Sequence, residues 1–375
     1  MRVNKDLIVF GEDWGALPTS TQHLVKQLAT RRKVLWVNSI GLRQPKFNRH
    51  DISRAMTKLL GKSKAAQMPL AKADMPSQMK VVTLRTIPAP RSKGARALAV
   101  KLMKAQLLPM IEKMNLIDPI LWTSLPTAAD LCGQLGESAI IYYCGDDFSA
   151  LAGVDHQTVH QHEQALASKA DLILTASDKL AQKFPSHKSH IIPHGVDLEL
   201  FTTPSPRAQD LPNNGRPIAG FYGSLSQWLD YDLIQHLALR LPNWDFVFIG
   251  PNELSQCQLP KLANVYYLGP KPHHQLPQYS QHWDVSLLPF IPNQQIQACN
   301  PLKLLEYLAV ERPVVATPFP ALAAYDHWVA QTSNVEDFCQ ALSQLKGSKI
   351  DSSEALQAHS WKNRAETIEQ LVRQL

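Results

Sequence analysis

A lysine and a glutamate stand close together in the stretch PLKLLE, which spans residues 301–306. Proline is favoured at the first position of a helix, so we expect a helix to begin near Pro301. A helix N-terminus offers unpaired N–H groups and the positive end of the helix dipole, which suit a diphosphate. Lys303 lies in the expected first turn and Glu306 follows three residues later, so both can face one ligand. The alternative is a Glu that favours the dipole and pairs with the Lys, worth roughly a few tenths of a kcal/mol.

Two adjacent carboxylates, Asp146 and Asp147, follow an apolar run that ends in Tyr-Tyr-Cys-Gly. A carboxylate at the carboxyl end of a buried strand can take the proton of a substrate hydroxyl. Adjacent side chains point apart, so we expect only one of the two to act. The alternative is an N-cap and turn for the helix that follows.

Two loops supply further candidates for substrate contact. The segment after the first apolar run contains Gly11, Trp14 and Thr19, and leads into a helix whose first turn holds His23. Loops after strands commonly carry function, and His23 could polarise an acceptor or could be a capped surface histidine. Later in the chain, Gly223-Ser224 ends an apolar run, where a glycine lets the backbone approach a phosphate.

Short apolar runs alternate with helical segments along the whole chain, a pattern typical of βαβ units around parallel sheets. The expected strands are 7–10, 34–38, 81–84, 120–123, 140–143, 172–175 and 190–192, then 218–222, 246–249, 265–268, 285–288 and 314–317. The main expected helices are 21–29, 95–114, 158–170, 231–241, 273–280, 302–310 and 361–372. We therefore predict an α/β fold with two Rossmann-like, doubly wound domains that face a cleft.

The domain boundaries follow from composition. Residues 202–217, TTPSPRAQDLPNNGRP, have no periodicity and are typical of a linker. We expect a first domain over 1–201, a second domain over 218–359, and a C-terminal helix over 360–375 that packs back on the first domain. A D-x-D at Asp230 and Asp232 could hold a metal-bound diphosphate, but N-terminal capping is the preferred interpretation.

The segment 264–317 contains LGP, DVSLLP, PLKLLEYLA and PVVAT, and the chain also carries IPHGVD at 192–197. In these pieces it resembles the C-terminal domain of GT-B-fold glycosyltransferases, in particular family-4-like enzymes of bacterial polysaccharide assembly. It is also similar to teichuronic-acid-type transferases and to the xanthan glucuronosyltransferase. The resemblance and the expected helix start together indicate a set of residues that bind the donor. These are Gly223, Ser224, His194, Gly269, Lys271, Pro289, Phe290, Pro301, Leu302, Lys303 and Glu306.

The resemblance also implies that 1–201 binds the acceptor and 218–359 the nucleotide sugar, and it implies roles for single residues. The Glu306 carboxylate would bind the ribose hydroxyls of a nucleotide sugar, and backbone from Gly269–Lys271 and Pro289–Phe290 would frame the base. The xanthan enzyme places an aspartate in a position similar to Asp146, which makes Asp146 the first choice of base and Asp147 the second. His194 stands where relatives often have Asn, and it could face the donor or serve packing.

Two departures from the family pattern stand out. Family-4 enzymes commonly have a second glutamate eight positions before Glu306, where this chain has Ala298. They also commonly carry basic residues after the strand that here ends in Gly223-Ser224. In this chain the residues that follow, 225–230, read LSQWLD. Lys303 would then supply the phosphate charge.

Charge is unevenly distributed along the chain. Between Gly41 and Asn115 stand 16 Lys or Arg and three Asp or Glu, a charge of +13, so the remainder carries −7. Apolar residues interrupt this basic segment, as in an amphipathic helix on an anionic membrane surface, at about 1 kcal/mol per basic residue. Aromatic residues are sparse, which argues against nucleic acid. A solvated helix face is the plain alternative.

The sequence excludes several classes. It contains no G-x-G-x-x-G after the first strand, no P-loop, no H-E-x-x-H and no C-x-x-C among five scattered cysteines. We predict a metal-independent hexosyltransferase without a cofactor, which moves sugar from a UDP- or GDP-linked donor to a polysaccharide or lipid-linked acceptor. We expect it in the cytoplasm, peripheral on the inner membrane face. The alternatives are a sugar-nucleotide epimerase on the same fold and a non-catalytic nucleotide-sugar-binding subunit.

Overall fold

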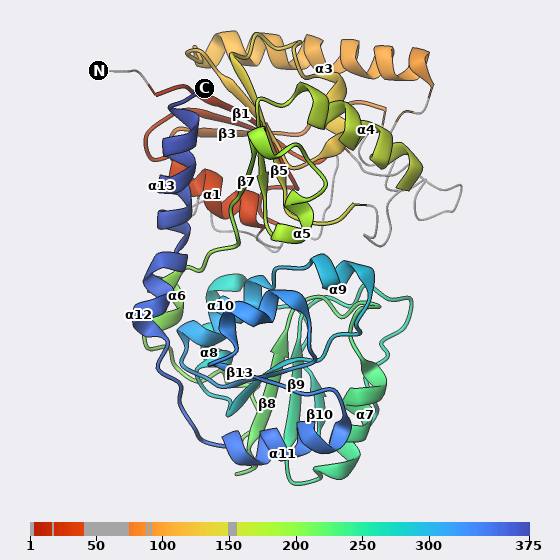
Figure 1. The fold of residues 1–375 in the computed structure, drawn as a ribbon, viewed down its shortest axis with the longest axis vertical. Coiled ribbons are helices and arrows are strands. Elements are labelled where there is room, and N and C mark those ends of the chain that lie inside the picture. The colour runs from red at the N-terminus through yellow and green to blue at the C-terminus, as the bar shows by residue number, and fades with distance from the viewer. Residues whose placement is uncertain (1–3, 17–18, 41–74, 88–89, 91, 149–155) are drawn as a thin grey trace. The chain divides into compact units, whose positions relative to one another are not determined.

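The computed structural model describes residues 4–16, 19–40, 75–87, 90, 92–148 and 156–375. The chain divides into two compact units (Figure 1). The first comprises Met1–Pro193 and Ala365–Leu375, and the second comprises His194–Arg364. Each unit is built on its own parallel sheet, as predicted.

The sheet of the first unit has the strand order β3-β2-β1-β4-β5-β6-β7 within the described residues. Its strands are β1 (Leu7–Phe10), β2 (Val34–Val37), β3 (Met79–Val82), β4 (Ile120–Thr123), β5 (Ala139–Cys144), β6 (Leu172–Thr175) and β7 (Ser189–Ile191). Its helices are α1 (Ser20–Leu28), α3 (Lys93–Met114), α4 (His156–Lys169), α5 (Asp178–Ala181) and, from Ala365 on, α13 (Trp361–Val372), with 3-10 turns η2 (Pro126–Asp130) and η3 (Ser186–Lys188). The strand order reverses between β1 and β4, where doubly wound sheets bind ligands.

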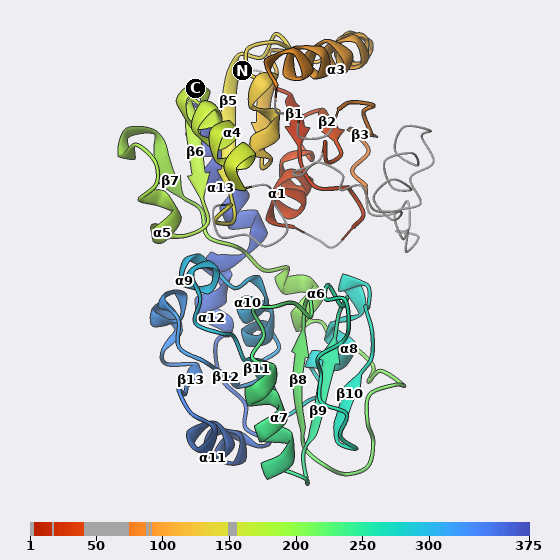
Figure 2. The same ribbon diagram turned by 90° about the vertical axis from the view of Figure 1, so that its right-hand side faces the viewer.

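The central strands form because they bury continuous apolar runs. Every residue of β1, β2, β4, β5 and β6 is buried. Each buried Val, Leu or Ile favours the fold by roughly 1.5–3 kcal/mol relative to an exposed one. Helices on both faces keep this sheet from water (Figure 2).

The C-terminal helix is tied to the first unit by charge. Arg32, which follows α1, forms an ion pair with Glu369 of α13. The two side chains are 1% and 10% exposed. Breaking a buried pair leaves an uncompensated charge, so this contact holds α13 against the first sheet.

The sheet of the second unit has the order β10-β9-β8-β11-β12-β13 in the described part of the chain, and it repeats the topology of the first. Its strands are β8 (Ile218–Tyr222), β9 (Asp245–Ile249), β10 (Val265–Tyr267), β11 (Val285–Leu288), β12 (Val314–Ala316) and β13 (Val329–Gln331). Its helices are α6 (Leu198–Thr202), α7 (Tyr231–Arg240), α8 (Pro277–Ser280), α9 (Gln294–Ala298), α10 (Leu302–Ala309), α11 (Val335–Leu345) and α12 (Ser353–Leu356), with η4 (His273–Gln275), η5 (Pro320–Tyr325) and η6 (Gln357–His359).

The structure differs from the sequence predictions in several places. The strand expected at 81–84 lies two residues earlier, in register with β2 through the pair Val34 and Met79. No element was predicted between residues 318 and 360, where β13 and α11 are found. Asp230 caps α7, since its carboxylate accepts a hydrogen bond from the Leu233 N–H at 2.8 Å.

The expected domain boundaries also differ from the observed units. Residues 202–217 were expected to link two domains, yet they belong to the second unit. Ala208 and Leu211 are buried in its core, and the Ala208 N–H donates to the Gln278 carbonyl at 3.0 Å. Apolar anchors inside a Pro- and Asn-rich segment explain why it packs as part of the unit.

Candidate functional site

Three glycines stand side by side at the carboxyl ends of adjacent strands in the second unit. Gly223 and Gly250 have φ angles of 143° and 140°, which favour glycine. The Gly250 N–H donates to the Gly269 carbonyl at 3.0 Å. A Cβ on Gly250 would lie 1.9 Å from the Gly223 carbonyl oxygen, so no side chain fits there. The result is an edge of bare backbone that a phosphate can approach closely.

Lys303 lies directly against this edge. It is the second residue of α10, whose N-cap is Pro301, as the sequence predicted. Its ammonium stands 5.6 Å and 5.5 Å from the ring centroids of Phe221 and Phe290, within cation–π range. Burial lowers the pKa of Lys303, while Cys299 and Glu306 act in the opposite direction.

Lys303 makes no ion pair with any residue that the structure describes. An ammonium packed between aromatic rings with no carboxylate against it is suited to an anionic ligand. The adjoining N–H groups at the start of α10 add a positive field.

Glu306 lies one turn further along α10 and is only 4% exposed. Its Oε1 accepts a hydrogen bond from Nε2 of His273 at 2.7 Å. The His273 ring packs edge-on against Phe201, with 5.5 Å between centroids. Burial raises the pKa of Tyr222, and the Glu306 carboxylate nearby raises it further. The carboxylate is therefore held in one place at the carboxyl edge of the sheet.

His194 lies near this cluster as a neutral imidazole. Burial lowers its pKa to about 4, with further contributions from the positive charges of Lys303 and Arg364. Its ring lies 6.5 Å from that of Trp361. A neutral histidine can donate one hydrogen bond and accept another.

Other residues predicted to bind the donor are engaged elsewhere. The Lys271 ammonium pairs with Asp210, which also accepts from the Tyr279 hydroxyl at 2.7 Å. The Phe290 N–H donates to the Thr317 hydroxyl at 3.0 Å, and the Pro289 carbonyl accepts from Asp230.

These contacts leave fewer backbone groups to frame a base than the resemblance implied. Ser224 follows Gly223 directly and is half-buried, as is Leu302 on α10. Ala298 ends α9 and is buried, so no carboxylate stands at that position.

The first unit has a carboxylate pair at the corresponding edge of its own sheet. Glu12 follows β1 by two residues and accepts hydrogen bonds from the Thr19 hydroxyl at 3.2 Å and the Ser124 hydroxyl at 3.5 Å. Burial raises the pKa of Glu12, and the negative charge of Asp146 adds to the rise. Glu12 follows β1 and Asp146 follows β5, and β4 lies between these two strands and pairs with both.

Asp146 and Asp147 have different surroundings. The Lys183 ammonium lies 3.0 Å from Asp147 Oδ1 and also 3.0 Å from the buried Glu163. Asp146 is exposed as a residue, yet its pKa is raised, first by protein atoms that displace water around the carboxyl group and then by Asp147. Asp147 thus anchors the loop, and Asp146 remains the candidate base.

The other predicted residues of this loop region shape it. Gly11 packs so tightly that a Cβ there would lie 2.5 Å from the Trp36 ring. The Trp14 N–H donates to Asn38 at 2.9 Å, and Thr19 caps α1. His23 is half-buried on α1.

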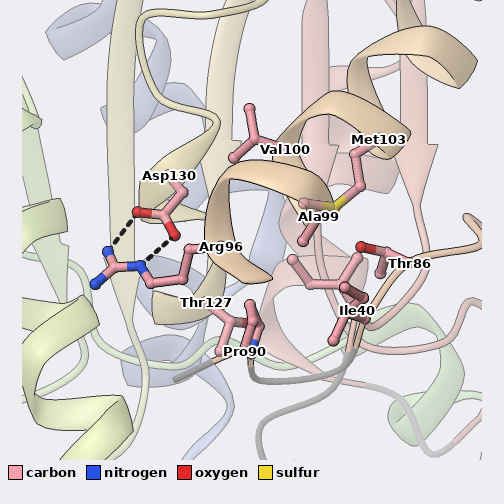
Figure 3. Close-up of a pocket in the computed structure, with 10 residues that line it drawn as sticks. Ile40, Thr86, Pro90, Arg96, Ala99, Val100, Met103, Thr127 and Asp130 are labelled. Atoms are coloured by element: carbon pink, nitrogen blue, oxygen red, sulfur yellow. Dashed lines mark hydrogen bonds and ion pairs between the residues drawn. The ribbon is translucent and has the colours of Figure 1, made fainter. Parts of the chain in front are cut away.

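A second feature of the first unit is a cavity beneath α3 (Figure 3). Arg96 and Asp130 form a two-bonded ion pair at its margin, and Ala99 and Met103 of α3 line it. The space that the centre of a water molecule can occupy inside it is about 10 Å³, so the cavity has room for about one water. It is too small for a sugar and belongs to the packing of α3.

Comparison with known proteins shows what the chain is similar to. Residues 216–347 match the family described as Glycosyl transferases group 1. The match lies within the second unit. A Bacillus subtilis (strain 168) protein, provisionally named teichuronic acid biosynthesis glycosyltransferase TuaH, is 28% identical over 255 residues. The alignment covers 62% of this chain and 64% of that protein, just under two thirds of its length.

Solved structures show the fold. The Anabaena protein Alr3699/HepE, solved with UDP and glucose, superposes on this chain with a TM-score of 0.68 at 13% sequence identity. The alignment covers 99% of this chain and 100% of the Anabaena chain. The sucrose-phosphate synthase of Thermosynechococcus elongatus has a TM-score of 0.69 at 15% identity and covers 99% of each. The predicted GT-B fold and the family-4-like resemblance are confirmed.

Sequence reasoning missed two residues of these clusters. Glu12 stands in Gly-Glu-Asp-Trp, and its place two residues after a buried strand was an available signal. His273 stands 33 residues before Glu306, and no sequence spacing predicts their contact. The described residues contain no group of three His, Cys, Asp or Glu that could hold a metal ion. None of their helices combines the length and apolar character needed to cross a membrane.

Proposed function

We propose that the protein is a glycosyltransferase that moves a sugar from a nucleoside diphosphate to a polysaccharide or lipid-linked oligosaccharide in bacterial surface polysaccharide synthesis. The observation that carries the proposal is Lys303, an ammonium without an ion-pair partner among the described residues, set against the glycine edge at the start of α10. The group 1 match over 216–347 and the relative's name support the activity.

The chemistry needs a place for the charge of the leaving group. As the bond between the sugar carbon and the phosphate oxygen breaks, negative charge grows on the diphosphate. Lys303, the α10 N-terminus and the backbone at Gly223 would meet that charge. Glu306 would bind the ribose, and UDP is the first donor to test because the Anabaena structure holds UDP.

The acceptor half of the reaction belongs to the first unit. The acceptor hydroxyl oxygen bonds to the sugar carbon, and its proton passes to the Asp146 carboxylate. Asp147 is held by Lys183 and would keep the loop in place. Glu12, which follows β1, would accept hydrogen bonds from the acceptor.

A membrane surface is the proposed location of the acceptor. Part of the basic segment 41–115 lies outside the described residues, since they omit 41–74. On α3, Leu98, Leu102 and Leu108 are 50%, 41% and 43% exposed, and Lys93 and Lys101 are exposed among them. Exposed leucines with flanking lysines suit an anionic lipid surface.

The test is incubation of the full chain with labelled UDP- and GDP-sugars, with and without bacterial lipid extract. Transfer of label to lipid or glycan supports the proposal. Isomerised free nucleotide sugar would support an epimerase instead. Binding without turnover would support a non-catalytic subunit, which Ala298 at the end of α9 favours.

A further inference from the structure

The contact between His273 and Glu306 links two parts of the second unit that are far apart in sequence. His273 opens η4, after β10, and Glu306 lies on α10, yet their side chains meet at 2.7 Å. Glu306 is 4% exposed and the His273 side chain 18%. A buried carboxylate needs a hydrogen-bond donor to stay in place, and His273 supplies one.

The contact with His273 fixes one oxygen of the Glu306 carboxylate and thereby orients the whole group. Oε1 accepts from His273 Nε2, and Phe201 packs edge-on against the imidazole at 5.5 Å and restricts its rotation. A carboxylate held by one oxygen presents the other in a defined direction. Lys303 lies one turn before Glu306 on the same helix, and the Glu306 charge acts on the pKa of the lysine.

We propose that His273 is a positioning residue that sets the Glu306 carboxylate for the vicinal hydroxyls of a nucleoside diphosphate's ribose. The inference rests on the proposed function, because Glu306 is there assigned to the ribose. The proposed role of His273 adds a reason why the site should bind ribose more tightly than deoxyribose. A site whose polar groups are oriented for a hydroxyl rejects the analogue that lacks it, because the buried groups are then left unpaired.

The test is calorimetry with UDP and GDP and with their 2′-deoxy and 3′-deoxy forms. The wild-type protein should prefer the ribose form of the nucleotide it binds by about tenfold or more, as expected for one lost hydrogen bond to a charged group. His273→Ala should reduce this preference to about onefold to threefold. His273→Gln should restore most of it, because Gln Nε2 can donate from a similar position.

Two further variants separate the possible explanations. His274→Ala changes the neighbouring exposed histidine and should leave the preference unchanged. In Glu306→Gln the preference should also fall, and adding His273→Ala to that variant should cost little more, since the two residues act through one contact. A circular dichroism melt confirms that each variant is folded.

The outcomes distinguish the two proposals. If His273→Ala keeps the full ribose preference while Glu306→Gln loses it, the positioning role is wrong and the ribose assignment stands. If neither variant changes the preference, or the wild-type protein binds neither UDP nor GDP, the assignment of Glu306 itself fails.

Discussion

The side chain of Lys303 occupies the space that a side chain at residue 223 would need. A Cβ on Gly223 would lie 2.8 Å from Lys303 Cε and 3.2 Å from its Nζ. Gly223 also has a φ of 143°, which other residues rarely adopt. The glycine and the lysine are therefore one unit of the proposed diphosphate site.

Gly223→Ala should displace Lys303 and weaken nucleoside diphosphate binding. Backbone strain of about 1–3 kcal/mol corresponds to about 5-fold to 150-fold in affinity if binding bears the full cost. Calorimetry with UDP and GDP measures it. The matched control is Gly215→Ala, which shares a positive φ of 80° but has open space around its Cβ. Equal losses in both variants would contradict the pairing with Lys303.

Lys303→Met should remove most of the diphosphate affinity, about 10-fold to 100-fold, since a hydrogen bond to a charged group contributes about 1.5–3 kcal/mol. The pKa of Lys303 is lowered by burial, so its charge is lost at a pH below the usual 10.5. As the pH rises through the range below 10.5, the wild-type affinity should fall more steeply than that of the variant, because only the wild type loses the Lys303 charge. A wild-type affinity that is constant across this range would argue against Lys303.

The sequence predicted the fold well because buried parallel strands leave a strong local signal. The bounds of β1, β4, β6, β8 and β11 agree with the prediction to the residue. Residues 202–217 were wrongly predicted to be a linker because Pro and Asn are typical of linkers. The burial of Ala208 depends on tertiary contacts, which the local sequence does not show.

The site was predicted less completely than the fold. Lys303 and Glu306 share one helix, so their spacing is local and could be read from the sequence. The partners of Glu306 and Lys271 come from other elements, and their identity depends on how the chain packs.

Asp146→Asn and Asp147→Asn should have unequal effects. If Asp146 is the base, its variant should lose about 10²-fold to 10⁴-fold in turnover, the usual range for general base catalysis. Asp147→Asn should keep most of its turnover and lose stability instead, because Lys183 would retain only Glu163 as its carboxylate partner among the described residues. Turnover and urea unfolding of both variants check this, and full turnover in Asp146→Asn would remove it as the base.

Leu98→Gln together with Leu102→Gln should weaken binding to anionic vesicles without unfolding the protein. Both leucines are exposed on α3, so their replacement removes no core contact. Sedimentation with vesicles of phosphatidylglycerol and phosphatidylcholine measures the effect. Leu239→Gln is the matched control, since Leu239 is 55% exposed on α7 of the other unit. Equal binding by wild type and double variant would rule out α3 as the membrane contact.

Glu12→Gln should stabilise the fold at neutral pH while it lowers activity. The pKa of Glu12 is raised above 4.5, so the folded chain binds more protons than the unfolded chain between the two pKa values. The wild-type free energy of unfolding therefore falls as the pH rises through that window. A glutamine side chain keeps an acceptor oxygen for Thr19 and Ser124 but carries no charge.

The advantage of the Glu12→Gln variant should accordingly be absent below pH 4.5 and grow as the pH rises from 4.5 through the raised pKa of Glu12. Urea unfolding across this range, with Glu112→Gln as an exposed control on α3, separates the local effect from a general change in charge. A stability difference that grows on acidification would show that Glu12 is held as a favourable carboxylate. In that case the raised pKa of Glu12, and with it the repulsion between Glu12 and Asp146, would be wrong.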